Sequence, residues 1–587
     1  MPALTSLASA VESKPDRHRA IRLDLISGGL FLAALWFILC RHLSGEWTFN
    51  EQYNYGWFVP FFALLLLWLR WETRPEPEVG GRKSEVRGQK SEVGGRWSVV
   101  GGRWSAMAIA IAIFALALLL PIRLFEIGNP DWRPLGWIHT ACVVTLTLLI
   151  IWYAGGTPWL RHFAFPVAFF FVAVPWITPI EVPIIQGLMR SVAAGATETI
   201  ALLGIPAQLE GNLIRIHNGL VGVNEACSGV RSLQTSLMIG LLFGELKRLS
   251  ILRRLGLIAG AIAIALIANF CRAVFLVWIA AAKSIPEVDR WHDIAGYTIV
   301  GLVFVGTLGL ASLLSRSKVE NRKAKVENET APHRGESVFR SSFLLPNFYF
   351  LISALIWIAL VEIGAASWYR AHERDLVTSV RWEVRWPENA PGFHETKITQ
   401  DVRRILRFDR GRAASWKWSL ESSPETPQPA GRTMTCSLFF FRWDPGQNSA
   451  LIANLHRPDV CLPAVGWTQV ADTGVKHYRV ASELALPFRH FEFRHGTPEN
   501  PAQQTAHAFY CLWEDRTAVG STLPQMAMSP STWTRSERVR AVMEGRRHLG
   551  QQVMEFVVLT RSPVELDQVN ARFAQALPEL IKVEIRK

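Results

Sequence analysis

Cysteine is scarce in this sequence, with seven among 587 residues, and no two cysteines have the C-x-x-C spacing. The scarcity argues against a dense disulfide framework, and the missing spacing argues against a zinc ribbon. Motifs of nucleic-acid-binding proteins are also missing, although the net charge is +13. We therefore expect no metal, no cofactor and no nucleic-acid partner, and the basic charge needs another explanation.

Long hydrophobic runs are abundant, and they gather before about residue 365, whereas the remainder has the pattern of an ordinary soluble domain. A bilayer core about 30 Å thick needs roughly 20 apolar residues per helix. The sequence predicts a polytopic all-α membrane bundle of about eight core helices plus one linking helix, followed by an extracytoplasmic α+β domain. The predicted spans are 25–42, 57–71, 105–121, 135–154, 164–180, 229–246, 255–281, 294–314 and 343–365.

Two apolar stretches allow another interpretation. The stretch 183–204 contains Arg190 and Glu198, so we expect a helix at the membrane interface or inside the bundle. The first run, Leu25 to Cys40, has a basic flank and resembles a cleaved signal peptide. The further spans favour an uncleaved first helix.

Lysine and arginine concentrate in four segments, 1–24, 72–104, 245–254 and 315–340. All four lie on one side of the membrane if the spans alternate, and the positive-inside rule makes that side the cytoplasm. We therefore expect a cytoplasmic segment 1–24, a membrane domain 25–315 with a low-complexity insertion at 72–104, a cytoplasmic linker 316–342, a linking helix 343–365 and an extracytoplasmic domain 366–587. The segments 43–56, 122–134, 181–228 and 282–293 are expected outside as well.

The segment "NEACSGVRSL" (Asn224 to Leu233) places Cys227 just before the span 229–246, after a predicted hairpin with Asn218-Gly219 at its turn. Backbone N–H groups and the helix dipole favour an anion at such a helix start, so the thiol pKa is expected to fall. Arg231 lies one turn further on, and Ser228 and Asn224 are possible supporting residues.

Two further residues are expected at the same face of the membrane. Arg272 interrupts the apolar run "NFCRAVFLVW", and His292 begins the next span in "DRWHDIAGY". A thiolate that attacks a peptide carbonyl, an arginine that stabilises the oxyanion and a histidine that transfers protons together suit acyl transfer. Taken singly, Cys227 is typical of a small buried hydrophobe, Arg272 of a snorkelling interfacial residue and His292 of a loop histidine.

These residues resemble a known family. "NEACSGVRSL" is similar to the signature of the exosortase/archaeosortase family of membrane cysteine transpeptidases, and "FPVAFFFVAVP" (Phe165 to Pro175) resembles its Phe-Pro-rich span. The early segment "YNYGWFVPFFALLLLW" also resembles the family, with Tyr55-Gly56 where His-Gly is common. The resemblance covers about residues 25–315. It maps the catalytic Cys, Arg and His of the family onto Cys227, Arg272 and His292.

The resemblance implies an enzyme of the bacterial cytoplasmic membrane whose partners are exported proteins with a C-terminal sorting signal. That signal is a Pro-Glu-Pro motif, an apolar span and a basic tail. The enzyme would cleave it through a thioacyl intermediate and transfer the protein to a surface acceptor. The active site and the C-terminal domain would face outward, in contact with membrane lipid.

The tail resembles a second known domain. "HRPDVCLPAVGWTQV" (His456 to Val470) is similar to the exosortase-associated domain first linked to methanolan exopolysaccharide biosynthesis. We expect strands at 437–443, 490–495 and 508–515 and helices at 536–548 and 563–581. His456 and Cys461 are a possible second thiol site, although a structural Cys461, packed or paired with Cys436 or Cys511, is favoured.

Two functions from different classes follow. The first is a membrane transpeptidase or protease linked to exopolysaccharide production. The second is a non-enzymatic transport or assembly component for exopolysaccharide, with the tail as a periplasmic binding module and the intramembrane charges along a path.

Overall fold

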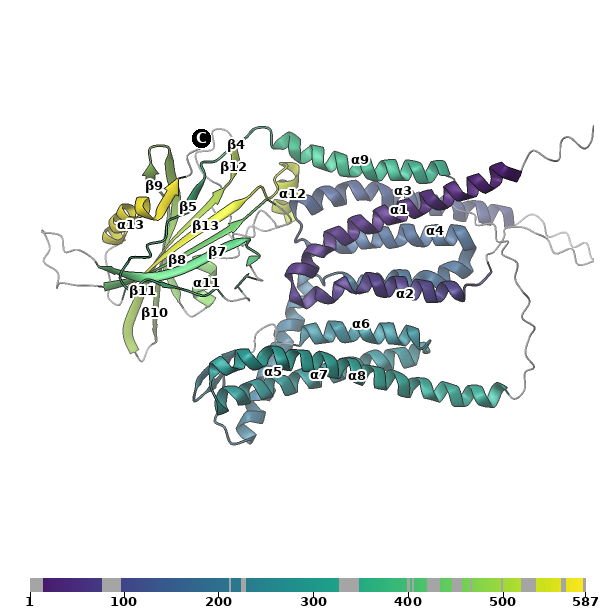
Figure 1. Cartoon of the computed structure of the whole chain (residues 1–587), viewed down its shortest axis with the longest axis horizontal. Helices are drawn as coiled ribbons and strands as arrows, with labels where there is room; N and C mark the ends of the chain where they lie inside the picture. Colours follow the sequence, from purple (N-terminus) through teal and green to yellow (C-terminus); the bar gives the residue numbers. More distant parts are fainter. Residues whose placement is uncertain are drawn as a thin grey trace, which may run out of the picture. The chain divides into compact units, whose positions relative to one another are not determined.

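The chain forms two compact units in the computed structural model (Figure 1). Unit 1 comprises Met1–Leu119 and Arg133–Leu360, and unit 2 comprises Leu120–Trp132 and Val361–Lys587. The structure describes residues 14–76, 97–210, 213–222, 229–326, 348–398, 402–403, 406–419, 433–445, 457–464, 467–497, 500–518, 535–560 and 566–583.

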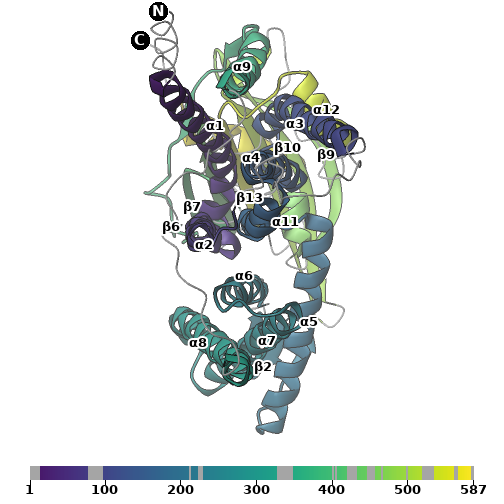
Figure 2. The same cartoon turned by 90° about the vertical axis from the view of Figure 1, so that its right-hand side faces the viewer.

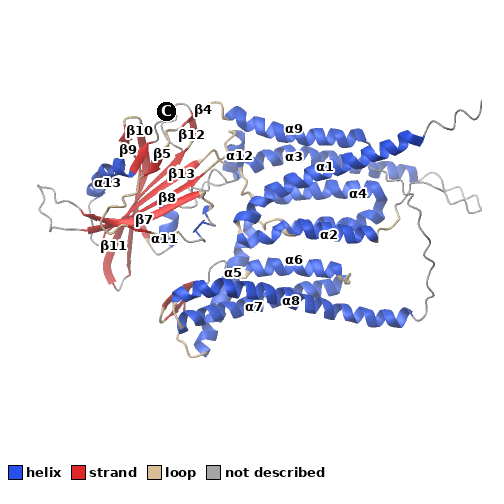
Figure 3. Ribbon diagram, in the orientation of Figure 1, coloured by secondary structure: helices blue, strands red, loops and turns tan. Residues whose placement is uncertain are grey.

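Unit 1 is built from helices and one small sheet (Figure 3). Within the part of the chain that the structure describes, six helical stretches are long and apolar enough to cross a membrane: 26–48, 106–128, 133–173, 251–282, 290–315 and 349–372. The elements up to the small sheet are α1 (Lys14–Phe49), η1 (Glu51–Trp57), α2 (Val59–Glu72), α3 (Trp97–Gly128), α4 (Arg133–Ala168), η2 (Phe169–Ala173) and α5 (Thr178–Leu202). The rest are β1 (Gln208–Glu210), β2 (Leu213–Ile216), β3 (Gly219–Gly222), α6 (Val230–Leu246), α7 (Ile251–Ala282), α8 (Ile285–Val326) and α9 (Phe348–His372).

The 133–173 stretch folds back on itself at Gly156, whose φ of 71° and ψ of −165° are not helical. Arg133 Nη1 donates to the carbonyl of Trp176 at 3.0 Å, and Trp137 Nε1 donates to that of Pro175 at 2.8 Å. A straight helix would hold these residues about 60 Å apart. The two segments are therefore antiparallel, and the predicted spans 135–154 and 164–180 fall on the two sides of the break.

A buried carboxylate organises one end of unit 1. Glu181 of α5 accepts hydrogen bonds from Gln52 Nε2 at 2.7 Å, from the Tyr53 hydroxyl and from the Arg133 guanidinium. The Tyr53 hydroxyl also accepts from Gln234 Nε2 of α6 at 3.2 Å. We call these five residues the Glu181 cluster. The sequence predicts that the segments around these five residues lie on one side of the membrane.

A second carboxylate organises another group of helix ends. Glu245, at the end of α6, accepts from Arg70 of α2 and from Arg254 of α7, with Arg254 Nη2 at 2.8 Å. Arg70 Nη1 also donates to the carbonyl of His162 in α4. These residues form the Glu245 cluster. The sequence places the segments that hold these residues on the opposite side of the membrane from the Glu181 cluster.

Helices α6, α7 and α8 form a contiguous group, seen nearly end-on in Figure 2. Helix α5 packs on α7, with Ala193, Ala196 and Ile200 against residues such as Ala273 and Ala280. The predicted stretch 183–204 thus lies against the bundle, and Arg190 and Glu198 are exposed.

The predicted hairpin is present as the antiparallel pair β2 and β3, and Ile214 and Ile216 are buried against α7 as their alternation indicates. The turn is His217-Asn218 rather than Asn218-Gly219, because Ile216 pairs with Gly219. The Asn218 side chain donates to the carbonyls of Ala280 and Ala281 at the end of α7. This contact anchors the turn.

Unit 2 contains a seven-stranded sheet in the order β6-β7-β8-β13-β11-β10-β9. Its strands are antiparallel and are β6 (His394–Glu395), β7 (Arg410–Ser419), β8 (Thr433–Trp443), β9 (Thr468–Ala481), β10 (Leu484–Thr497), β11 (Asn500–Glu514) and β13 (Gln551–Thr560). The other described elements are β4 (Leu376–Thr378), β5 (Trp382–Val384), α11 (Pro458–Ala464), β12 (Arg516–Ala518), α12 (Arg535–Met543), α13 (Leu566–Leu580) and β14 (Ile581–Val583). The mixed helix and sheet composition agrees with the predicted α+β tail.

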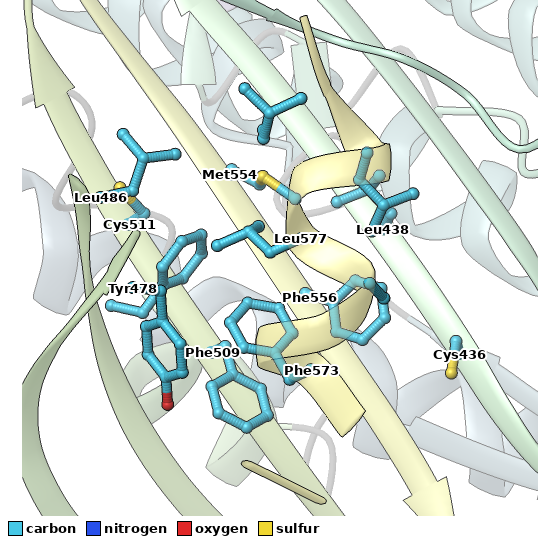
Figure 4. Close-up of a cluster of buried hydrophobic side chains, with 14 of the residues drawn as sticks. Cys436, Leu438, Tyr478, Leu486, Phe509, Cys511, Met554, Phe556, Phe573 and Leu577 are labelled. Atoms are coloured by element: carbon cyan, nitrogen blue, oxygen red, sulfur yellow. The ribbon is translucent and has the colours of Figure 1, made fainter. Parts of the chain in front are cut away.

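Helix α13 covers one face of this sheet (Figure 4). Phe573 is fully buried and stacks on Phe509 of β11 with ring centroids 4.1 Å apart. Leu577 and Phe556 continue the same layer. The five buried positions of α13, from Val569 to Leu580, recur at helical spacing and form the apolar stripe expected of a helix on a sheet.

Unit 2 begins earlier than the predicted boundary at residue 366 and includes the end of α3. The Tyr369 hydroxyl donates to the carbonyl of Leu124 at 2.6 Å, and Arg123 Nε lies 2.5 Å from Glu362 Oε1. Asp131 pairs with Arg538 of α12. These are contacts between residues more than 200 positions apart, which a composition boundary does not reveal.

Candidate active site

Arg272 and His292 lie together on consecutive helices. Arg272 Nη2 is 2.8 Å from His292 Nε2, and it also donates to the His292 carbonyl at 3.3 Å. Arg272 belongs to the last third of α7 and His292 to the early part of α8, and both side chains are half-buried. The structure thus brings together two of the three residues that the sequence singled out.

The direction of this hydrogen bond defines the state of the imidazole. A guanidinium can only donate, so Nε2 of His292 accepts, and the neutral ring carries its proton on Nδ1. This assignment follows from the hydrogen bond and fixes which nitrogen can release a proton. A Cβ at Gly296, one turn beyond His292, would lie 3.6 Å from Arg272 Nη2, which is an ordinary van der Waals contact.

The start of α6 is held against the same part of α7. Gly229, the N-cap residue of α6, has a left-handed φ of 84°. A Cβ at Gly229 would lie only 2.7 Å from Asn269 Nδ2, so the Asn269 side chain packs directly on this glycine. Asn269 is 1% exposed and lies three positions before Arg272, on the same side of α7. The first turn of α6 therefore meets α7 one turn from the Arg272–His292 pair.

The remaining site residues are distributed as follows. Cys227, Ser228 and Asn224 lie outside the described residues, and Gly229 follows Cys227 by two positions. Arg231 is exposed on the first turn of α6. Cys227, Ser228, Asn224 and Arg231 stay predictions as functional residues.

The described part of the site has the chemistry of anion stabilisation and proton transfer. Arg272 supplies fixed N–H donors with a permanent positive charge, which suits an oxygen that becomes negative during a reaction. His292 supplies an ionisable nitrogen within hydrogen-bond distance of that charge. Among the described residues, no cluster of three or more His, Cys, Asp or Glu side chains could hold a metal ion.

The comparison with protein families gives one match. Residues 47–309 match the family model of the transmembrane exosortases (Exosortase_EpsH). This part of the chain is similar to the transmembrane exosortases. The matched exosortase region includes Cys227, Arg272 and His292, together with both buried carboxylate clusters. Searches among curated proteins and among solved structures gave no match.

Two features of the exosortase region were not foreseen from the sequence. Asn269 is a polar residue inside an apolar run, and this exception in the sequence could have marked it as a candidate site residue. Its contact with Gly229 could not be predicted in this way, because it depends on how two helices pack. The Glu181 cluster joins residues up to 182 positions apart (52 to 234), and no local pattern predicts such contacts.

The proposed second site in the tail has one described member. Cys461 lies in α11, half-buried, and His456 lies outside the described residues. Burial, with a smaller effect from Glu555 and Asp459, raises the pKa of the Cys461 thiol to about 11. Few Cys461 thiolates form at neutral pH in such a site, which favours a structural role.

The tail cysteines are not linked in pairs. Cys436 in β8 and Cys511 in β11 are buried with free thiols, and neither forms a disulfide with Cys461. Burial raises the pKa of both Cys436 and Cys511 above its ordinary value. These two cysteines behave as small core residues of the sheet.

Proposed function

We propose that this protein is a membrane cysteine transpeptidase or protease that cleaves C-terminal sorting signals of exported proteins. Cys227 is the nucleophile, Arg272 stabilises the oxyanion and His292 transfers protons. One observation supports the proposal above others: the Arg272–His292 pair lies one turn from the point where Asn269 packs on Gly229. Gly229 follows Cys227 by two residues, so chain connectivity keeps the thiol near the pair.

The proposed reaction runs in two halves. The Cys227 thiol gives its proton to the His292 imidazole, the thiolate attacks the scissile carbonyl carbon, and the oxyanion that forms is stabilised by the Arg272 guanidinium. The C–N bond then breaks, the His292 imidazolium returns its proton to the leaving amine, and a thioester remains on Cys227. In the second half an acceptor nucleophile attacks the thioester carbonyl, loses its proton to the imidazole and releases the thiolate.

The substrate is proposed to be membrane-anchored by its own C-terminal apolar span. Its Pro-Glu-Pro motif would lie just outside the bilayer, where the helix ends of α6, α7 and α8 meet. The acceptor is proposed to be a surface component, linked to exopolysaccharide production. The tail is proposed to act on the same extracytoplasmic side as an exosortase-associated module.

The test is co-expression of the full chain with a reporter that ends in Pro-Glu-Pro, an apolar span and a basic tail. The processed fraction is measured by gel mobility and by mass spectrometry of the new C-terminus. Cys227→Ala is expected to abolish processing, and hydroxylamine is expected to release the reporter from wild-type enzyme, since a thioester reacts with this nucleophile. Cys461→Ala is the matched control and is expected to process normally.

Each outcome decides between the functions. Unchanged processing in the Cys227→Ala variant would overturn the proposal and would favour the non-enzymatic membrane component. Loss of processing in Cys461→Ala alone would place the chemistry in the tail instead. Labelling of Cys227 by a membrane-impermeant alkylating reagent from the cytoplasmic face alone would contradict the proposed side of the site.

A further inference from the structure

A pocket of about 260 Å³ lies within unit 2 and is separate from Arg272 and His292, which belong to unit 1. Strands β7, β8, β11 and β13 of the large sheet contribute to it, together with the segment 379–386 that contains β5. The lining combines indole rings with hydrogen-bonding side chains. Its principal residues are Trp382, Trp386, Arg442, Trp513, Asp515 and Gln552.

One row of side chains across the sheet supplies the polar part of the pocket. The strand registers place Gln552 of β13 between Arg442 of β8 and Trp513 of β11. Gln552 is 2% exposed, and its side-chain amide accepts from Arg442 Nη1 at 2.9 Å and donates to the Trp382 carbonyl at 3.2 Å. Met554, the next residue of β13 on this face, is fully buried in the apolar core. A row of hydrogen-bonding groups therefore borders the core on the same face of the sheet.

The guanidinium in this row already has its counter-charges. Arg442 Nη2 and Nη1 donate to the two carboxylate oxygens of Asp515 at 2.6 and 3.1 Å, and Arg442 Nε donates to Asp444 at 3.2 Å. A bidentate pair of this kind fixes the orientation of both groups. The side chains of Arg442 and Asp515 are nevertheless 16% and 13% exposed. The pocket thus offers donors and acceptors side by side in fixed positions, and it has no need of a further anion.

Tryptophan side chains supply the apolar part of the pocket. Trp382 is 2% exposed, and Trp386 and Trp513 are half-buried. Trp513 Nε1 donates to the Val380 carbonyl at 3.1 Å, and the Arg412 guanidinium lies 4.9 Å from the ring centroid of Trp386. These contacts hold the two half-buried rings in place. An indole is a large, rigid apolar surface, and here it lies beside an ordered set of polar groups.

We propose that this pocket binds a neutral saccharide. A sugar ring has C–H groups on its faces, which pack on an aromatic ring, and hydroxyl groups around its edge, each of which can both donate and accept a hydrogen bond. Trp386 and Trp513 provide the aromatic surface, and the Arg442–Asp515 pair provides the donors and acceptors. The volume lies just below the range of about 300–1,000 Å³ for sites of drug-sized ligands, which suits a short saccharide.

Other classes of ligand fit these residues less well. A phosphate or carboxylate would compete with Asp515 for the guanidinium of Arg442. An acyl chain would place hydrocarbon against the ion pair and against Gln552, and polar groups without hydrogen-bond partners are costly beside hydrocarbon. A proline-containing acidic peptide shares the need for an aromatic surface, so it enters the test as a competing ligand. The saccharide site is additional to the proposed cleavage reaction and does not depend on it.

The experiment measures saccharide binding to the full chain, purified in lauryldimethylamine oxide, a detergent without a sugar headgroup. Cellotriose, maltotriose and mannotriose are the neutral probes, and binding is followed by saturation-transfer difference NMR and by isothermal titration calorimetry. At least one of them is expected to bind with a millimolar or lower Kd and to show its largest saturation transfer on ring C–H protons. Trigalacturonic acid and a Pro-Glu-Pro peptide are the comparison ligands, and both are expected to bind more weakly.

Trp386→Leu tests the aromatic part of the site. Leucine keeps an apolar side chain but removes the flat ring, so the affinity for the neutral trisaccharide is expected to fall about fivefold. Trp467→Leu is the matched control, because Trp467 is also half-buried and packs on His495 instead of lining the pocket. It is expected to bind with the affinity of wild type.

Asp515→Asn tests the polar part of the site with little change in shape. The amide replaces one acceptor oxygen with a donor and weakens the pair with Arg442, so the affinity is expected to fall about fivefold or more. Asp472→Asn is its matched control, since Asp472 forms a similar pair with Arg489 outside the pocket. The Tm of each variant in the same detergent identifies any that fails to fold.

Three results would overturn the proposal. The first is the absence of binding by all three neutral trisaccharides at millimolar concentration. The second is an equal affinity of Trp386→Leu and Trp467→Leu for the bound trisaccharide, which would exclude this pocket as the site. The third is tighter binding of the Pro-Glu-Pro peptide than of any trisaccharide, which would assign the pocket to a peptide. None of these readouts involves cleavage, so the proposed reaction is tested separately by reporter processing.

Discussion

Asn269 fills the space next to Gly229, with its Nδ2 2.7 Å from the position that a glycine Cβ would take. This contact connects the start of α6 to α7 one turn before Arg272. The Asn269 side chain is 1% exposed. The start of α6 is thereby fixed relative to the arginine.

Gly229→Ala is expected to disrupt this contact. The new methyl group would overlap Asn269, and the φ of 84° is unfavourable for any residue with a Cβ. We expect a loss of stability of about 1–3 kcal/mol and lower processing of a sorting-signal reporter. Gly301→Ala is the control, because a Cβ at Gly301 meets nothing within 4 Å. Equal Tm values for the two variants, measured in detergent, would contradict the packing argument.

Arg272→Lys is expected to lower kcat about 100-fold or more, because an ammonium cannot replace the fork of donors that faces His292 and the proposed oxyanion. The rate is measured by single-turnover cleavage of the reporter. Arg290→Lys serves as control, since the Arg290 side chain is 76% exposed. An Arg272→Lys enzyme with wild-type kcat would show that the arginine has no part in the reaction.

Glu181→Gln is expected to destabilise unit 1 by about 3 kcal/mol, because it leaves the charge of Arg133 without its buried carboxylate. Glu198→Gln on the same helix is exposed and is expected to be neutral. Thermal unfolding of both variants in the same detergent tests this prediction. A Tm for Glu181→Gln that matched Glu198→Gln would mean that the Glu181 cluster is not stabilising.

Acid is expected to destabilise the sheet of unit 2 through buried histidines. His548 is 4% exposed, and neither of its ring nitrogens has a hydrogen-bond partner among the residues that the structure describes. Burial lowers the pKa of His548 to about 4, and burial together with His507 lowers that of His490 to about 4. Between pH 6.5 and 4 the unfolded chain therefore binds more protons, and this part of the stability is lost as the pH falls through that window.

The measurement is hydrogen exchange of the β13 amides in the full chain from pH 7 to 4, corrected for intrinsic exchange rates. His548→Gln is expected to reduce the pH dependence, and the exposed His477→Gln is expected to leave it unchanged. Glu555 acts in the opposite direction, because burial raises its pKa to about 8 and favours the folded state at low pH. An identical pH profile for His548→Gln and wild type would exclude the histidine as a cause.

Much of the architecture could be read from periodic patterns. The runs that became α6 and α7, the alternation of Ile214 and Ile216, and the strands around 437–443 and 508–515 all have strong local signals. Strands β7, β9 and β13 were not singled out, although the tail was expected to be rich in strands. β13 is buried on both faces and lacks the alternation that marks a half-exposed strand.

Only part of the candidate active site could be predicted from the sequence. A charge inside an apolar run marked Arg272, and helix alternation placed His292 at the same end; in the structure Arg272 Nη2 lies 2.8 Å from His292 Nε2. The contact of Asn269 with Gly229 and the hydrogen bonds to Glu181 from η1 and α4 depend on tertiary packing, which no spacing within one helix encodes. The role of Cys227 stays a prediction, because the residue lies outside the described part of the chain.

The reversal at Gly156 affects every later segment of the chain. A hydropathy profile counts 133–173 as a single apolar stretch, whereas the contacts of Arg133 and Trp137 with residues 175–176 show a chain that returns to where it started. A residue there that continued the helix would send residues 157–173 in the opposite direction, and the hydrogen bonds of Arg133 and Trp137 to the carbonyls of residues 175–176 could not form.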